Sequence, residues 1–373
     1  MKRLLCITSA LNTGGAETFL MKIYRTLDRE KYQMDFCVMS NEKGFYEEEI
    51  KLLGGKIFHI IPKTENMLKS FFSIKKIVKE NNYNYVIRIN EHSLSVIDLI
   101  AARLGGAKNL ILRSTNANTQ SKKRHLLHKL FQILPKTIPT VKIAPSTEAA
   151  EYTFGKNQVK NGRIHKLNNG VPIDKFLFCE NIRTEKRKEL GIENNFVVGH
   201  VGRFSPQKNH MFLLEIFKLI KNKLPNAILL LIGDGELREN IKNKAQELNV
   251  LDSIKFLGVR SDIPELLMAM DIKIFPSFFE GMPNTIIEAQ ASGLPSLISD
   301  TITKEADITG LVTYMPLTES AEKWAEKCLE IKNESIQRKN TKEYFIKEKY
   351  DINSVTEEFI RLVFDTERKR HHV

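Results

Sequence analysis

Two glutamates, Glu280 and Glu288, flank a loop whose residue types suit a phosphate-bearing ligand. The loop follows a strand-like apolar run at 271–275 and leads into a helical pattern that begins near Asn284 and ends at Gly293. A helix that begins there points free backbone N–H groups and its positive dipole end into the loop, which favours a diphosphate. Carboxylates repel phosphate, so the glutamates suit sugar and ribose hydroxyls better. Their spacing alone fits equally well the alternative that Glu280 is a surface loop residue and Glu288 an ordinary first-turn acid favoured by the helix dipole.

Two cations follow a second predicted strand, at 197–201. Arg203 and Lys208 lie in the loop between this strand and the next helical pattern. Ligands of doubly wound sheets collect at the carboxyl ends of the strands, so both side chains can reach a diphosphate there. Gly202 permits a close approach of the backbone to the ligand. The alternative is a pair of solvated loop cations.

The glutamate loop resembles the E-x7-E signature of retaining glycosyltransferases of family 4, which are two-domain enzymes of the GT-B fold. Further segments resemble other motifs of this family, in the family's order and over nearly the whole chain. These segments are residues 12–17, 144–146 with 154–155, 168–176, 199–209 and 231–236. The tail of the glutamate motif, at 299–305, is most similar to that of bacterial capsule and exopolysaccharide transferases.

The resemblance implies a role for each residue around the donor. Arg203 and Lys208 would neutralise the leaving nucleoside diphosphate without a divalent metal, so neither a metal nor a cofactor is expected. Glu288 would hold the ribose hydroxyls, and Glu280 would contact the transferring sugar near its anomeric carbon. The expected catalytic residues are Glu280, Arg203 and Lys208. The expected nucleotide-sugar site contains Gly14, Gly15, Gly202, Arg203, Lys208, Arg260, Glu280, Gly281, Met282, Asn284, Thr285 and Glu288.

The acceptor side is less clearly marked. Related capsule transferases often carry a histidine-containing stretch where this chain has residues 113–119, so an acceptor role for such histidines is in doubt here. His92 and Asn116 are the polar candidates for acceptor contacts, although His92 is equally compatible with a satisfied loop histidine. No residue stands out as a general base. This suits a retaining reaction in which the leaving phosphate oxygen takes the acceptor proton on the same face, while the protein positions and stabilises the reactants.

Composition indicates a globular protein of ordinary type. A chain of 373 residues is too long for one core and fits two domains, and its 42% apolar and 27% charged content is typical of soluble proteins. The cysteines are scattered without metal-ligand spacing or a disulfide framework, which favours a reducing cytoplasm. They are Cys6, Cys37, Cys179 and Cys328. No apolar run reaches about 18 residues, so no transmembrane helix is expected.

The net charge of +12 is concentrated in one segment. Residues 99–147 contain no aspartate or glutamate but nine lysines and arginines. Within this segment, leucines at helical spacing adjoin Lys122, Lys123, Arg124 and Lys129, a pattern typical of a helix on an anionic membrane surface. Alternatively, the leucines face the core and the lysines are merely solvated. Nucleic acid is a weaker candidate partner, because no recognised nucleic-acid fold accompanies the charge.

Strand-like and helix-like segments alternate along the chain, and the series begins again near residue 196. The expected strands are 4–9, 34–39, 57–60, 86–89, 196–201, 228–232, 254–257 and 272–275. The expected helices between them are 14–27, 46–53, 67–80, 211–223, 237–248 and 263–270, with a last helix at 355–364. This rhythm indicates βαβ units and a parallel sheet in each half.

We therefore expect an α/β protein of the GT-B class, with two Rossmann-like, doubly wound parallel-sheet domains facing across a cleft. The predicted acceptor-side domain spans 1–175 and is joined by a crossover helix at about 350–373. The predicted nucleotide-sugar domain spans 176–349.

These features predict a cytoplasmic transferase bound to the inner face of the cell membrane. It would move a hexose or an N-acetylhexosamine from a nucleotide sugar, with UDP-sugar the favoured donor, to a lipid-linked saccharide in capsule or exopolysaccharide synthesis. A nucleotide-sugar 2-epimerase of the same fold would instead release a free sugar and need no acceptor. A non-catalytic sugar-nucleotide-binding subunit would keep Arg203 and Lys208 while tolerating change at Glu280.

Overall fold

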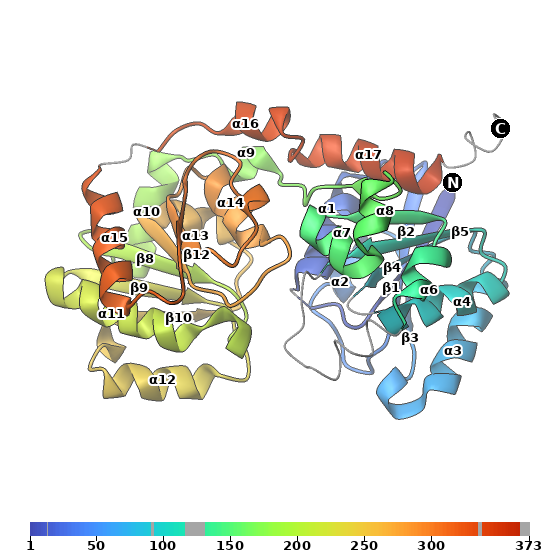
Figure 1. Ribbon diagram of the computed structural model, residues 1–373, viewed down its shortest axis with the longest axis horizontal. Coiled ribbons are helices and arrows are strands. Elements are labelled where there is room, and N and C mark those ends of the chain that lie inside the picture. Colours follow the sequence, from blue (N-terminus) through green and yellow to red (C-terminus); the bar gives the residue numbers. More distant parts are fainter. Residues whose placement is uncertain (13, 91–92, 116–130, 335–337, 366–373) are drawn as a thin grey trace. The chain divides into compact units, whose positions relative to one another are not determined.

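The computed structural model describes residues 1–12, 14–90, 93–115, 131–334 and 338–365. The chain divides into two compact units (Figure 1). Unit 1 comprises Met1–Gly170 and Lys349–Val373, and unit 2 comprises Val171–Glu348. The chain thus leaves unit 1 at Gly170, a few residues before the expected boundary, and returns to it at Lys349.

Unit 1 is built on a parallel sheet of seven strands in the order β3-β2-β1-β4-β5-β6-β7. The strands are β1 (Lys2–Thr8), β2 (Tyr32–Val38), β3 (Ile57–His59), β4 (Tyr85–Asn90), β5 (Asn109–Ser114), β6 (Val141–Ala144) and β7 (His165–Lys166). Every residue of β5 is buried, as expected for a parallel strand covered on both faces. The order reverses between β1 and β4, which makes the sheet doubly wound.

Helices cover both faces of this sheet. They are α1 (Gly15–Thr26), α2 (Glu47–Leu52), α3 (Lys63–Glu80), η1 (Ser93–Val96), α4 (Ile97–Leu104), α6 (Ile133–Thr137), α7 (Thr147–Phe154), α8 (Lys156–Lys160) and α17 (Ile352–Phe364). One core joins α1 and α17 to the sheet, and Phe19 and Phe359 meet there edge to face. A second core joins α3 and α4 to the opposite face. Asp351 caps α17 through its carboxylate, which accepts hydrogen bonds from the backbone of Asn353 and Ser354.

Unit 2 repeats the design with six parallel strands in the order β10-β9-β8-β11-β12-β13. The strands are β8 (Phe196–Val201), β9 (Ala227–Ile232), β10 (Ile254–Gly258), β11 (Ile272–Phe275), β12 (Ser296–Ser299) and β13 (Val312–Met315). The order reverses between β8 and β11, which lie side by side. The predicted fold class, two doubly wound parallel-sheet units, is therefore confirmed.

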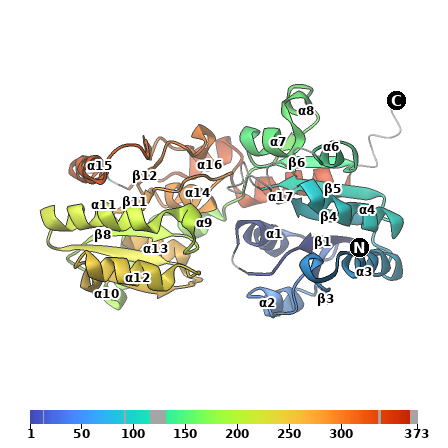
Figure 2. The same cartoon turned by 60° about the horizontal axis from the view of Figure 1, so that its bottom comes forward.

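Helices also flank the sheet of unit 2, and Figure 2 shows helices on both sides of the strands in each unit. They are α9 (Ile173–Phe176), α10 (Glu180–Leu190), η2 (Pro206–Lys208), α11 (His210–Lys223), α12 (Arg238–Glu247), η3 (Leu251–Ser253), α13 (Ile263–Ala269), α14 (Asn284–Ala291), η4 (Lys304–Ala306), α15 (Ala321–Asn333) and α16 (Lys342–Lys347). Apolar residues of α11, α12 and α15 form one core with the sheet.

Candidate active site

The loops that follow β8 and β11 meet at the carboxyl edge of the unit 2 sheet. These neighbouring strands mark the point at which the strand order reverses, where open α/β sheets bind their ligands. Backbone and side chain tie the loops together: the amide of Phe278 donates to the carbonyl of Gln207 at 2.9 Å, and Gln207 Nε2 donates to the carbonyl of Phe279 at 2.8 Å. The loop residues therefore hold a fixed relation to one another.

Lys208 and Glu280 form an ion pair between these two loops. Lys208 Nζ lies 2.6 Å from Glu280 Oε1, and the side chains are only 16% and 10% exposed. The Lys208 ammonium also lies over the ring of Phe275, 4.7 Å from its centroid. At this degree of burial, water screens the two charges poorly, so they act strongly on any group that binds beside them. The structure thus brings together two of the three residues predicted to be catalytic.

Arg203, the third predicted residue, has a different environment. Its side chain is 74% exposed, and Nη2 lies 3.3 Å from Glu236 Oε2. A solvated pair of this kind holds its partners weakly. The backbone of Arg203 is therefore held in the loop after β8, whereas its guanidinium group is little constrained.

Glycines allow the loop after β9 to pack directly against the loop after β8. Gly233 has φ +130°, and a Cβ atom there would collide with the carbonyl oxygen of Gly202. Gly235 has φ +159°, and its Cβ would collide with the backbone of Phe204. This Gly-x-Gly sequence therefore forms a turn near the site at which the two loops approach closely. Gly202 itself lies beside Lys208, whose Cε would be 3.3 Å from an added Cβ.

The helix α14 begins at Asn284, where the sequence pattern placed it. Its first turn presents backbone N–H groups that no residue of the helix can pair. Thr285 Oγ1 is buried there, without a hydrogen-bond partner among the described residues. Met282, just before the helix, and Glu288, in its second turn, are each 7% exposed. Gly281 completes the loop that joins this helix to Glu280.

Sequence reasoning missed Lys273, which lies within β11 below these loops. Its side chain is 0% exposed, and Nζ donates a hydrogen bond to the carbonyl of Thr285 at 2.6 Å. Burial lowers the pKa of Lys273 to about 7, although the nearby carboxylates of Glu288 and Glu280 oppose this shift. The sequence did contain a signal for this site, namely a lysine inside an otherwise apolar strand. Lysine is almost never fully buried unless it has a polar or charged partner.

Two buried histidines, also missed, lie beneath the same loops. The rings of His200 on β8 and His210 on α11 are 4.6 Å apart, and His200 stacks on Phe275 at 5.2 Å. His200 Nδ1 lies 3.0 Å from the carbonyl oxygen of Ile274. Burial lowers the pKa of both rings, that of His210 to about 4, so both are neutral at pH 7.

Arg260, predicted to lie near the nucleotide base, is held by a neighbouring carboxylate. Its Nε and Nη2 atoms donate to the two carboxylate oxygens of Asp262 at 2.7 and 2.6 Å. These contacts, together with Lys186 at 2.9 Å, lower the pKa of Asp262 far below its usual range. The guanidinium is thus fixed in place after β10, and its contact with a base remains a prediction.

The glycine pair of unit 1 opens the helix α1. Gly14 is the residue before the helix, and a Cβ there would collide with the carboxylate of Glu17. Gly15 is the first helical residue. The other unit 1 candidates, His92 and Asn116, lie outside the described residues. The basic residues predicted to contact membrane lie outside them as well, namely Lys122, Lys123, Arg124 and Lys129.

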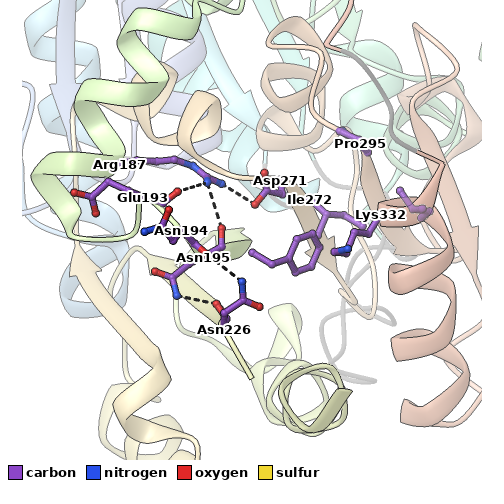
Figure 3. Close-up of a pocket in the computed structure, with 11 residues that line it drawn as sticks. Arg187, Glu193, Asn194, Asn195, Asn226, Asp271, Ile272, Pro295 and Lys332 are labelled. Atoms are coloured by element: carbon purple, nitrogen blue, oxygen red, sulfur yellow. Dashed lines mark hydrogen bonds and ion pairs between the residues drawn. The ribbon is translucent and has the colours of Figure 1, made fainter. Parts of the chain in front are cut away.

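A separate pocket of about 450 Å³ lies at the opposite, amino edge of the unit 2 sheet (Figure 3). Phe196 and Ile272, the first residues of β8 and β11, line it. Its polar groups point toward one another: Arg187 donates to Asp271 at 2.6 Å and to the carbonyl of Asn195 at 3.2 Å. This network ties the strand starts to α10. The polar side chains of the pocket are thus largely committed to the fold.

The described part of the chain contains no group of three or more His, Cys, Asp and Glu side chains that could hold a metal ion. No described helix combines the length and apolar character needed to cross a bilayer.

Comparison with known proteins agrees with this architecture. Residues 182–348 match the family model for glycosyl transferases group 1. The putative glycosyltransferase EpsF of Bacillus subtilis (strain 168) is 34% identical over 331 residues, which cover 87% of this chain and 86% of the relative. An Escherichia coli protein, the UDP-Gal:alpha-D-GlcNAc-diphosphoundecaprenol alpha-1,3-galactosyltransferase, is 33% identical over 62% of each chain.

Among solved structures, Anabaena Alr3699/HepE in complex with UDP-glucose has the same fold. It matches with a TM-score of 0.78 and 18% identity, covering 97% of this chain and 99% of the other. Together with the EpsF match over most of both sequences, the fold and the family model identify the chain: it belongs to the group 1 glycosyltransferases.

Proposed function

We propose that this chain is a retaining family 4 enzyme that transfers a hexose or an N-acetylhexosamine from a UDP-sugar to a lipid-linked saccharide in capsule or exopolysaccharide synthesis. The observation that carries the proposal is the buried Lys208–Glu280 pair at the junction of β8 and β11. Relatives support the donor and acceptor classes, since the E. coli relative is a galactosyltransferase that uses UDP-Gal and a diphosphoundecaprenol-linked sugar.

In this proposal the donor lies along the carboxyl edge of the unit 2 sheet. Its diphosphate faces Lys208 and the first turn of α14 near Asn284 and Thr285, where backbone N–H groups and cationic charge favour it. Arg203 turns its exposed guanidinium toward the same phosphates. Glu288 accepts from the ribose hydroxyls, and Glu280 accepts from the transferring sugar.

The reaction breaks the bond between the anomeric carbon and the phosphate oxygen and forms a bond from that carbon to the acceptor oxygen on the same face. The acceptor proton passes to the departing phosphate oxygen. Lys208 and Arg203 stabilise the negative charge that develops on the leaving group, and Glu280 stabilises positive charge at the anomeric carbon. Cationic side chains would thus serve the leaving group without a metal ion.

We also propose that unit 1 binds the inner membrane face, where a lipid-linked acceptor would be found. The supporting observation is an apolar ridge on α3, formed by Met67, Leu68 and Phe72, which are 53%, 70% and 58% exposed. Exposed lysines share this helix with the ridge: Lys69, Lys76 and Lys79. Apolar side chains next to lysines suit the boundary of an anionic bilayer.

The decisive experiment incubates the purified protein with a panel of radiolabelled nucleotide sugars and a bacterial membrane lipid extract. Label that appears in the lipid fraction supports the transferase. Label released as free sugar, with or without lipid, indicates a 2-epimerase instead. Retained label in the nucleotide sugar, despite measurable binding, indicates a non-catalytic binding subunit. The Glu280→Gln variant provides the matched negative control.

A further inference from the structure

Lys273 occupies the middle of β11, between its parallel neighbours β8 and β12, opposite Gly199 and Ser296. Its neighbours in the strand, Ile272 and Ile274, point into the core formed with α11 and α15. Lys273 therefore points to the other face, where its Nζ reaches the first turn of α14 at the carbonyl of Thr285, 2.6 Å away.

The surroundings of this ammonium leave its charge incompletely balanced. The carboxylates of Glu288 on α14 and Glu280 in the β11 loop act on it through space, and none of the described carboxylates is paired with it directly. Lys208, the nearest other cation, repels it. The ring of Phe275 lies 5.5 Å from Lys273 Nζ and 4.7 Å from Lys208 Nζ, so both ammonium groups lie near one aromatic ring.

Among the described residues, the remaining titratable groups nearby are the histidines on β8 and α11. His200 stacks on Phe275, and His210 packs against His200. Both rings are neutral at pH 7, because burial lowers the pKa of each. They therefore add no charge to balance Lys273. The neighbouring strand residues, Gly199 and Ser296, are not titratable.

We infer that Lys273 is a positioning residue for the donor diphosphate: it fixes the first turn of α14 and takes up a proton when a nucleoside diphosphate binds beside that turn. The inference rests on the proposed function, because it assumes that the diphosphate lies at the start of α14. An anion there would balance the ammonium that Glu280 and Glu288 balance only in part.

The sign of the effect follows from the charge. With a pKa of about 7, Lys273 is roughly half protonated at pH 7 in the free protein. A nearby anion favours the charged form and raises this pKa, so binding at pH 7 takes up about half a proton. Near pH 6 the lysine is already charged and little uptake remains. Above pH 7 the affinity for the anion should fall, by up to about tenfold per pH unit.

The test is calorimetric titration of the full-length protein with UDP from about pH 6 to about pH 9, in buffers that differ in ionisation enthalpy. The buffer dependence gives the number of protons exchanged. Lys273→Met removes the ammonium, and Lys273→Arg keeps a charge that does not titrate in this range. Lys255→Met, the same change on the edge strand β10, is the matched control and should behave as wild type.

We expect wild type to bind UDP at least about tenfold more tightly than Lys273→Met near pH 6, and this gap should close toward about pH 9. A gap that is constant with pH would show that Lys273 only shapes the helix start and would overturn the inference. Proton uptake can be measured on the wild type alone, so a variant that fails to fold does not prevent the test. If the wild type binds UDP at pH 7 without taking up protons, the inference is also overturned.

The two proposals fail in different ways. If wild type binds none of UDP, ADP and GDP, the proposed function fails at the level of the donor. If it binds one of them but exchanges no protons through Lys273, only the present inference fails and the donor site stands.

Discussion

Arg88 in unit 1 and Lys273 in unit 2 lie on corresponding strands, since β4 and β11 each lie next to the first strand of their own sheet. Both side chains are buried, at 4% and 0% exposure. Arg88 donates to Asp98 at 2.8 Å and to the carbonyl of Ile89 at 2.7 Å, so its charge is fully engaged. Lys273 instead donates to the carbonyl of Thr285, and the carboxylates of Glu288 and Glu280 act on it at longer range.

The difference separates a structural cation from one that can respond to a ligand. Asp98 also pairs with a second cation, Lys63, at 2.6 Å, so both cations of this cluster contact a carboxylate directly. In unit 2 the carboxylate of Glu280 pairs with Lys208, and among the described residues Lys273 has no ion pair of its own. A buried charge that lacks a direct counterion gains most from an incoming ion.

The largest effect should come from breaking the ion-pair cluster that Asp98 forms with Arg88 and Lys63 in unit 1. Asp98→Asn leaves Arg88 and Lys63 without their carboxylate, and a buried pair that loses one partner typically costs about 3–5 kcal/mol. Urea unfolding should show this loss. UDP affinity measured on the folded variant should be unchanged, because Asp98 is not among the residues proposed to contact the donor. Asp28→Ala, which removes an exposed carboxylate, serves as the control and should leave the unfolding midpoint in place. Equal midpoints for both variants would contradict the comparison.

Asp98→Asn should lower the free energy of unfolding, whereas removing Lys273 should raise it. Its pKa is about 7 in the fold and about 10.4 in the unfolded chain, so the unfolded state binds more protons between these values. Wild-type stability should therefore rise by up to a few kcal/mol as the pH increases from about 7 to about 10. Lys273→Met should lack this rise, whereas Lys255→Met should keep it. Parallel stability curves for all three proteins would show that Lys273 titrates normally.

Substitutions of Lys208 and Glu280 should have different effects: the first should weaken UDP binding, and the second should lower turnover. Lys208→Ala removes a charge-assisted contact to the diphosphate of about 1.5–3 kcal/mol, so UDP affinity should fall about ten- to a hundredfold. The loss of affinity in Arg203→Ala should lie at the lower end of this range, because the Arg203 side chain is largely solvated. Calorimetry measures both, and unaltered affinity in both variants would remove these residues from the site.

Glu280→Gln should behave differently, because its proposed contact is to the transferring sugar. UDP affinity should stay within a few-fold of wild type, while the turnover of UDP-sugar should fall by at least about tenfold. Radiolabel transfer at saturating donor measures the turnover. A Glu280→Gln variant with full transfer activity would defeat the assignment.

The smallest effect is expected at the apolar ridge of α3. The double variant Leu68→Ser/Phe72→Ser should weaken binding to anionic vesicles by about tenfold, since each side chain loses part of the roughly 1.5–3 kcal/mol that full burial provides. Leu52→Ser is the matched control, because Leu52 is 87% exposed on α2 of the same unit. Sedimentation with phosphatidylglycerol vesicles provides the measurement. Equal loss in both variants, or none in either, would place the membrane contact elsewhere.

The local patterns of the sequence predicted the elements well where each pattern is self-contained. The strands at 196–201 and 272–275 and the helix start at Asn284 agree with β8, β11 and α14. The helix predicted from Met67 begins earlier, at Lys63, because a kink at Asn66 joins two helical pieces that apolar periodicity does not connect. Periodicity reports which residues face a core, and it is silent about a turn of helix that is mostly exposed.

By itself, the sequence determined the alternation of strands and helices, the family and the loops that carry Arg203, Lys208, Glu280 and Glu288. Each of these features follows from residue types within a short stretch of chain. Only the tertiary structure decided that Lys208 pairs with Glu280, 72 residues away, while Arg203 stays in solvent. It also decided that Lys273 is buried beneath them. Such contacts depend on the order of strands in the sheet, which places β8 against β11, and no local pattern encodes that order.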